Sequence, residues 1–202
     1  MSIFNKLSFK DQAFRLRETA ILDATTQLFA NKGFDLMTMD DVALAVGISK
    51  PSLYKHFKSK DDLAAAAMLR LLHEAEGFLD GLDQGLGPTA TLSALLEWAM
   101  RVRLAGGLPF LPSTSPHIRS MLTRNIRYVA AAIKLNSRLK KIVQQGQKAG
   151  ELRKELPADV ILYSFYARTC DPAVEYLRLY AKMSDDDIVK HMLSVCFSGL
   201  TS

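Results

Sequence analysis

Apolar residues recur at helical spacing along almost the whole chain. Between Arg17 and Asn31, the residues Ile21, Ala24 and Leu28 are three and four positions apart, so they share one face of a helix. No stretch shows the sustained period-two alternation of a half-buried strand. The sequence therefore predicts an all-α fold.

Glycine and proline gather at a few places and predict where helices end. Breaks are expected at 81–88, 105–116 and 150–157. Pro172 falls inside a further helical stretch and should kink or split it, because proline has no amide hydrogen. Beyond residue 60, the pattern predicts helices near 61–80, 89–105, 117–147, 157–182 and 185–200.

The composition is typical of a globular protein, with 49% hydrophobic and 23% charged residues. No apolar run reaches the roughly 20 residues that span a bilayer, and the N-terminal MSIFNKLSFKDQ lacks the apolar core of a signal peptide. We therefore predict a cytoplasmic protein without a membrane partner. Cys170 and Cys196 belong to no ligand motif, so no metal and no cofactor is expected. The net charge of +5 permits a nucleic-acid partner without requiring one.

Residues 38–57 predict two short helices joined by a sharp turn. Thr38, followed by a carboxylate at Asp41, is typical of a helix N-cap. Gly47 ends that helix after about two turns. Ser49 can cap the next helix, and Pro51 suits its first turn, where a missing N–H is harmless.

The second of these helices has the pattern of a recognition helix. Leu53 and Phe57 are four residues apart and would face the core, which leaves polar and basic side chains outside. A lysine cluster alone usually marks a solvated surface, but its place on a capped second helix favours the DNA major groove. The candidate DNA contacts, to bases at the helix start and to phosphates elsewhere, are Thr38, Ser49, Lys50, Pro51, Ser52, Tyr54, Lys55, His56, Lys58 and Lys60.

One set of motif residues extends through 21–63: Ala24, Leu28, Phe29, Gly33, Phe34, Thr38, Val46–Ser49, Leu53, Tyr54, His56, Phe57, Ser59 and Lys60. With this set, residues 21–63 resemble the N-terminal domain of the TetR family of transcriptional regulators. Pro51 stands where many members have glycine or alanine.

The resemblance implies about nine helices in two domains. Residues 1–60 would be the helix-turn-helix DNA-binding domain, and 61–202 a helical domain for effector binding and dimerisation. The expected protein is no enzyme but a homodimeric repressor, which a small-molecule effector releases from a pseudo-palindromic operator. An activator, or a regulator that needs a corepressor, fits the sequence equally well.

Residues of the larger domain allow weaker predictions. An arginine that faces the cavity would favour an anionic effector, although apolar and aromatic stripes more often form ordinary core. The pocket candidates are Met68, Trp98, Arg101, Phe110, Met121, Arg124, Tyr128, Phe165 and Tyr166. The candidates for the dimer interface, which could instead face their own core, are Ile188, Met192, Val195 and Gly199.

Two basic segments remain open in their interpretation. Residues 117–154 carry ten Lys or Arg and one acid, Glu151. This segment is either a solvated surface or a surface that binds an acidic effector or makes a second contact with DNA. An N-terminal arm is either a disordered tail or a groove-reaching element, and its cations are Lys6, Lys10, Arg15 and Arg17.

A second class of function, an all-α enzyme or carrier, is the main alternative. It is disfavoured because no nucleophile–base grouping or carboxylate pair can be placed together from the sequence. The histidines are dispersed, at His56, His73, His117 and His191.

Overall fold

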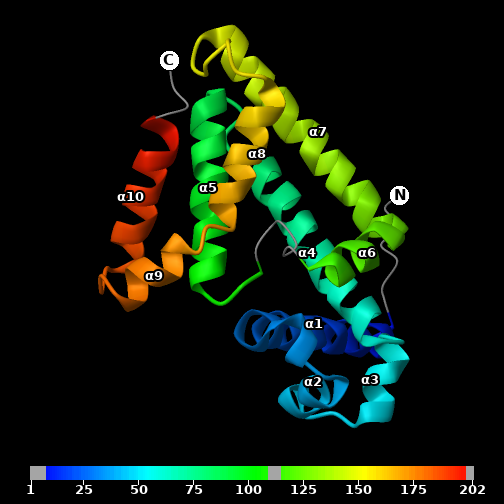
Figure 1. Ribbon diagram of the computed structural model, residues 1–202. Helices are drawn as coiled ribbons and strands as arrows, with labels where there is room; N and C mark the ends of the chain where they lie inside the picture. Colours follow the sequence, from blue (N-terminus) through cyan, green and yellow to red (C-terminus); the bar gives the residue numbers. More distant parts are fainter. Residues whose placement is uncertain (1–7, 109–114, 199–202) are drawn as a thin grey trace, which may run out of the picture. The chain divides into compact units, whose positions relative to one another are not determined.

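The computed structural model describes residues 8–108 and 115–198, and within these residues it contains ten α-helices and no strand (Figure 1). The predicted all-α fold is confirmed. The helices are α1 (Phe9–Leu36), α2 (Met39–Val46), α3 (Lys50–His56), α4 (Lys60–Gly81), α5 (Pro88–Leu104), α6 (Pro116–Arg124), α7 (Ile126–Ala149), α8 (Ala158–Thr169), α9 (Ala173–Leu179) and α10 (Asp185–Ser198).

The chain packs as two compact units, Met1–Ala67 and Met68–Ser202. The sequence had placed a domain boundary between residues 60 and 61. The division by packing falls seven residues later, inside α4. Each unit has its own core and is described separately.

The first unit consists of α1, α2, α3 and the first turns of α4. Its core includes Ile21 of α1, Val42 of α2, Leu53 of α3 and Leu63 of α4, all of them fully buried. Gly33, at a φ of 76°, interrupts the helical backbone of α1, which continues to Leu36. Such a positive φ is open to glycine because it has no Cβ.

The start of α1 differs from the sequence prediction. The helix begins at Phe9 rather than near Arg17, and Ser8 caps it by accepting a hydrogen bond from the Asp11 N–H. Lys10, Arg15 and Arg17 therefore lie on a helix and not on a disordered tail, whereas Lys6 lies outside the described residues. Apolar periodicity missed these turns because almost all of their side chains are exposed.

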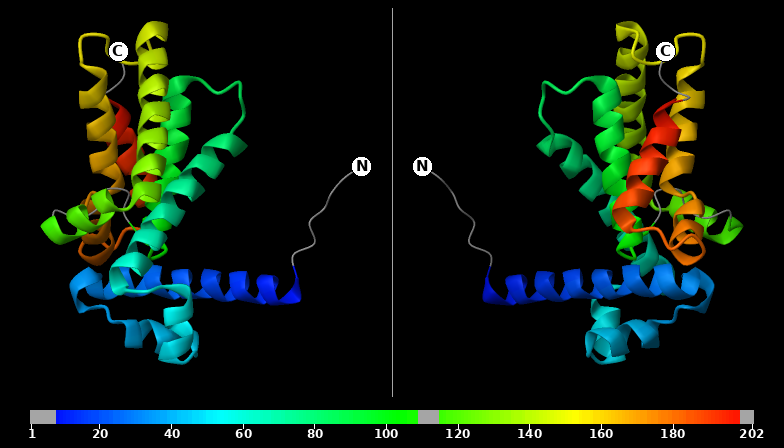
Figure 2. Two further views of the ribbon diagram at one scale, coloured as in Figure 1. Left: turned by 90° about the vertical axis from the view of Figure 1, so that its right-hand side faces the viewer. Right: turned by 90° about the vertical axis from the view of Figure 1, so that its left-hand side faces the viewer.

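The second unit is organised around α5, which packs against α7, α8, α9 and α10 (Figure 2). Leu92, Leu95, Leu96, Ala99 and Met100 give α5 a broad buried face. An α-helix with several packed neighbours needs such a wide apolar stripe. No helix in the described part of the chain is long and apolar enough to cross a membrane.

Two predicted helices are each split in the structure. Pro172 separates α8 from α9, as expected. The second break, between α6 and α7 at Asn125, was not predicted. Asn125 has a φ of −87° and a ψ of 102°, and its side chain accepts the N–H of Tyr128 to cap α7. Asparagine is a good N-cap, but a single one inside a basic stretch is a weak signal.

Candidate nucleic-acid interface and effector cavity

The first helix of the helix-turn-helix is fixed by a reciprocal cap. The Asp41 N–H donates to Thr38 Oγ1 at 3.1 Å, and the Thr38 N–H donates to Asp41 Oδ2 at 3.0 Å. Hydrogen bonds from Lys32 and then from Thr38 lower the pKa of the Asp41 carboxyl. This capping box holds Thr38, an exposed predicted phosphate contact, at the N-terminus of α2.

The turn between α2 and α3 depends on Gly47. Its φ of 72° and ψ of 34° are left-handed, and the Ile48 N–H donates back to the Ala43 carbonyl at 3.0 Å. This is a common helix ending, in which a glycine closes the last turn. Ser49 then caps α3 by accepting the Ser52 N–H at 3.4 Å. Two short helices are thereby joined by a turn of only a few residues.

Helix α3 buries one face and exposes the other. Leu53 is fully buried and Phe57 is 4% exposed, as the spacing predicted. Three more candidates, Ser52, His56 and Lys60, are half-buried. The exposed candidates, on which we base the interface, are Thr38, Ser49, Lys50, Pro51, Tyr54, Lys55 and Lys58.

Two of the candidate lysines already have partners within the first unit. Lys50 Nζ lies 2.9 Å from Asp40, and this contact raises the pKa of Lys50. Lys60 Nζ donates to the Asp35 carbonyl at 3.1 Å and sits 4.3 Å from the centroid of the Phe34 ring. Lys60 thus ties α4 to the end of α1, whereas the exposed Lys50 can exchange its carboxylate for a phosphate.

His56 has surroundings that the sequence did not predict. Its ring stacks on Phe14 of α1, with 4.0 Å between the ring centroids. Its Nδ1 is buried and has no hydrogen-bond partner. Burial also lowers the pKa of His56, so the neutral form predominates at pH 7. These surroundings suit a positioning role better than a phosphate contact.

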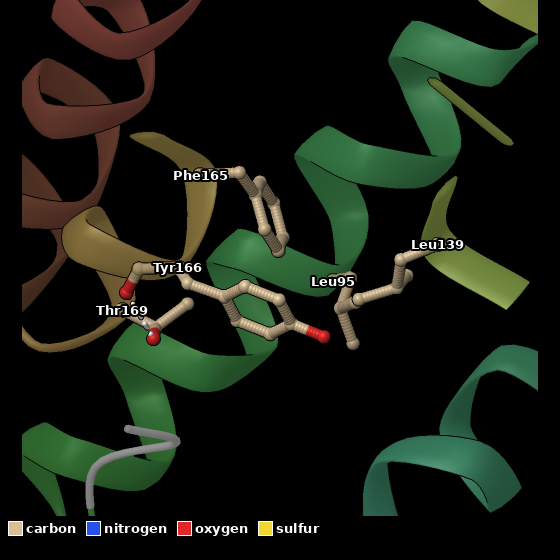
Figure 3. Close-up of a pocket in the computed structure, with 5 residues that line it drawn as sticks. All are labelled: Leu95, Leu139, Phe165, Tyr166 and Thr169. Atoms are coloured by element: carbon tan, nitrogen blue, oxygen red, sulfur yellow. Dashed lines mark hydrogen bonds between the residues drawn. The ribbon is translucent and has the colours of Figure 1, made fainter. Parts of the chain in front are cut away.

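A small cavity lies within the second unit between α5, α7 and α8 (Figure 3). It has no room for a water molecule, and it is lined by Leu95, Leu139, Phe165, Tyr166 and Thr169. The Tyr166 hydroxyl points toward Leu95, and burial raises the pKa of this phenol. Phe165 and Tyr166 were pocket candidates. Leu95, Leu139 and Thr169 were missed, because leucines at helical spacing indicate core as readily as a cavity.

The remaining pocket candidates do not line this cavity. Trp98 stacks on Phe78 with 5.4 Å between ring centroids, and Arg101 forms ion pairs with Glu97 and Asp186. Phe110 lies outside the described residues. Three candidates, Met68, Met121 and Tyr128, are buried elsewhere, and Arg124 is exposed.

Several cations of the second unit face acids of the same unit. Arg103 holds Glu175 through two hydrogen bonds of 2.7 and 2.9 Å. From the basic segment 117–154, Arg138 contacts Glu76 and Asp80. Lys134 also reaches Glu76, and Lys140 reaches Asp159. These pairings neutralise part of the positive charge of that segment.

The residues of α10 that were predicted to form the dimer interface differ in their exposure. Ile188 is fully buried and Met192 is 8% exposed within the single chain, so both face its own core, the alternative that the sequence left open. Val195 is 61% exposed. Gly199 lies outside the described residues. In the part of the chain that the structure describes, no group of His, Cys, Asp or Glu could hold a metal ion.

Comparison with known proteins agrees with this site. Residues 21–67 match the family model described as bacterial regulatory proteins, tetR family. The transcriptional repressor KstR2 of Rhodococcus jostii is 28% identical over 193 residues, with 92% of each chain covered.

Solved structures share the fold. A TetR-family regulator from Rhodococcus sp. superposes with a TM-score of 0.69 at 21% identity, with 93% of this chain and 100% of that chain covered. FadR from Bacillus subtilis, solved in complex with stearoyl-CoA, gives a TM-score of 0.68 at 15% identity, with 90% and 98% covered.

A capped helix-turn-helix with an exposed basic helix is typical of the DNA-binding domains of transcription regulators. Residues 21–67 are thus a DNA-binding domain of the TetR family, and over its length the chain is similar to TetR-family transcriptional regulators.

Proposed function

We propose that the protein is a homodimeric repressor that binds a pseudo-palindromic operator and is released by a small-molecule effector. The observation that carries the proposal is the exposed face of α3, on which Ser49, Lys50, Pro51, Tyr54 and Lys55 surround a buried Leu53. The N-terminal residues of α3 would read bases, and the exposed cations would contact phosphates.

Dimerisation follows from the need to bind two half-sites. Two reading heads must meet major grooves about 34 Å apart, or a multiple of this distance. Val160 and Tyr163 on α8 and Val195 on α10 are at least half exposed in the single chain. Apolar side chains of this kind are suitable contacts for a second copy, so we assign the interface to the outer faces of α8 and α10.

The effector site is assigned to the cavity around Tyr166. In the structure this cavity has no room for a water molecule, whereas ligand pockets have roughly 300–1,000 Å³. An effector would therefore have to separate α5, α7 and α8 before it could bind there. An effector would act by binding an expanded state more tightly and so changing the separation of the two heads. The lining favours a mainly apolar effector, with the Tyr166 hydroxyl as its polar contact.

The decisive experiment selects bound DNA from random fragments with the purified protein at about physiological salt. Recovery of an inverted repeat is expected, and analytical ultracentrifugation should show a dimer on that DNA. Recovery of unsorted DNA only, with a steep loss of binding on added salt, would contradict sequence-specific recognition.

The recovered repeat then serves as the probe for a library of apolar compounds that release it. Tyr166→Phe, which removes the proposed polar contact, should weaken release by the effector without weakening operator binding. A reporter behind the repeat, measured with and without the gene, separates repression from activation.

A further inference from the structure

The first turns of α1 extend beyond the core of their own unit (Figure 2). Phe9 is 87% exposed and Leu16 is 72% exposed, and the first buried residue of the helix is Ile21. A helical end of this kind is marginal in water unless tertiary contacts hold it. A tertiary contact is therefore needed to keep these turns helical.

The contact that orders this end is the stack between Phe14 and His56. The two ring centroids are 4.0 Å apart and the ring planes differ by 25°. His56 is the last residue of the recognition helix α3. The two rings therefore join the projecting end of α1 directly to the C-terminal end of the helix assigned to the major groove.

The same face of α1 carries two cations. Lys10, Phe14, Arg17 and Ile21 follow at spacings of four, three and four residues, which places them within about 60° of one another around a helix. Ile21 enters the core of the first unit, which fixes the direction of this face. Arg17 is close enough to His56 to act on its pKa.

Exposed lysines flank the stack on the other side. Lys55 precedes His56 on α3, and Lys58 follows shortly after the helix ends. Lys10 and Arg17 would thus extend a run of positive charge from α3 onto α1. A polyanion that lies along α3 is a fitting partner for such an extended run.

We propose that the first turns of α1 are a second phosphate-contacting element, in which Lys10 and Arg17 bind the DNA backbone beside the base pairs read by α3. His56 and Phe14 are its positioning residues. This inference rests on the proposed DNA-binding function.

Arg15 offers a matched control, because it lies on the same turns but about 100° around the helix from Phe14. The variants Lys10→Gln/Arg17→Gln and Arg15→Gln are compared for binding to the selected repeat across a series of salt concentrations. The double variant should lower the salt slope by about 0.9 for each lost phosphate contact, and Arg15→Gln should leave it unchanged. The proposal would be overturned if the salt slope fell by the same amount per removed charge in the double variant and in Arg15→Gln.

Phe14→Ala tests the positioning role. It should lower the salt slope as much as the double charge variant, add nothing in combination with it, and accelerate hydrogen exchange of the amides at 9–17. Phe14→Tyr, which keeps the stack, should restore both readouts. An unchanged slope in Phe14→Ala would reject the stack as the positioning contact.

The outcome with the wild-type protein separates the two proposals. A wild-type protein that binds its repeat, with variants that fail to differ, overturns this inference alone. A wild-type protein that selects no sequence overturns the proposed function, and one that binds no DNA overturns both.

Discussion

Gly47 in the first unit and Gly146 in the second are required for different physical reasons. Gly47 has a φ of 72°, and a Cβ built on it would meet nothing within 4 Å. Gly146 lies within helix α7, and its Cβ would come within 2.8 Å of Leu152 Cδ1 and 3.2 Å of Pro88 Cβ. The first glycine is required by its own backbone conformation, and the second by close packing against Leu152, six residues later, and against Pro88 of a distant segment.

The polar contacts of the two units show the same difference. The cap of α2 joins Thr38 to Asp41, three residues apart. The start of α5 is instead held by Glu151, which accepts the Thr89 N–H at 2.8 Å across 62 residues. The helix-turn-helix is therefore set largely by short-range signals, whereas the second unit is set by tertiary packing.

The largest expected effect comes from Leu53→Ala. Removing a fully buried leucine should lower the free energy of unfolding by about 2–5 kcal/mol. A small unit has little stability in reserve, so residues 39–57 should lose protection from hydrogen exchange. Leu135→Ala, at a site 1% exposed in the second unit, is the matched change and should leave that protection intact. Equal loss in both variants would show that the units unfold as one.

Substitutions of the two glycines should have the next-largest effects on stability. Gly47→Ala should lower the free energy of unfolding by about 1–2 kcal/mol through its left-handed backbone, and Gly47→Asn by less. Gly146→Ala should lower it by about 1–3 kcal/mol through overpacking. Adding Leu152→Val should rescue Gly146→Ala in urea titrations, whereas Gly47→Ala has no neighbour whose trimming could help. Failure of that rescue would contradict the packing explanation.

This difference also explains what the sequence could predict. The Thr38 cap, the Gly47 turn and the Ser49 cap lie within a dozen residues and have known chemistry, so the helix-turn-helix was predicted from them. The family resemblance supplied the domain arrangement that short-range signals could not. The Phe14–His56 contact was missed because it joins residues 42 positions apart.

In the second unit, sequence pattern predicted most helix bounds but not which side chains meet. Ile188 and Val195 lie seven residues apart on α10, yet one is fully buried and the other 61% exposed. Periodicity identifies an apolar stripe but not its partner. Arg101 was assigned to the pocket, although Glu97 and Asp186 bind it in the structure.

Helix caps should give intermediate effects in both units. Thr38→Ala removes one half of the capping box on α2, and Asn125→Ala removes the cap of α7. Each should lower the free energy of unfolding by about 1 kcal/mol. Thr38→Ala should also weaken binding to the selected repeat, and Thr38→Ser should restore both properties. Weaker operator binding in Asn125→Ala of equal size would show that the effect comes from lost stability alone.

The smallest effect on stability, and the sharpest contrast in function, concerns two exposed ion pairs. Lys50 contacts Asp40 at 2.9 Å in the first unit, and Lys140 contacts Asp159 at 2.8 Å in the second. Exposed ion pairs contribute little to stability because solvent screens them, so Lys50→Gln and Lys140→Gln should barely change urea midpoints.

In DNA binding, the two lysine variants should differ. Lys50→Gln should lower the salt slope of operator binding by about 0.9, as expected for one lost phosphate contact, and Lys140→Gln should not change it. Asp40→Asn should strengthen binding at low salt, since Lys50 no longer has to leave a carboxylate and one repulsive charge near the phosphates is gone. Equal slopes for both lysine variants would mean that Lys50 stays with Asp40 on DNA, and that the exposed start of α3 reads the groove without this cation.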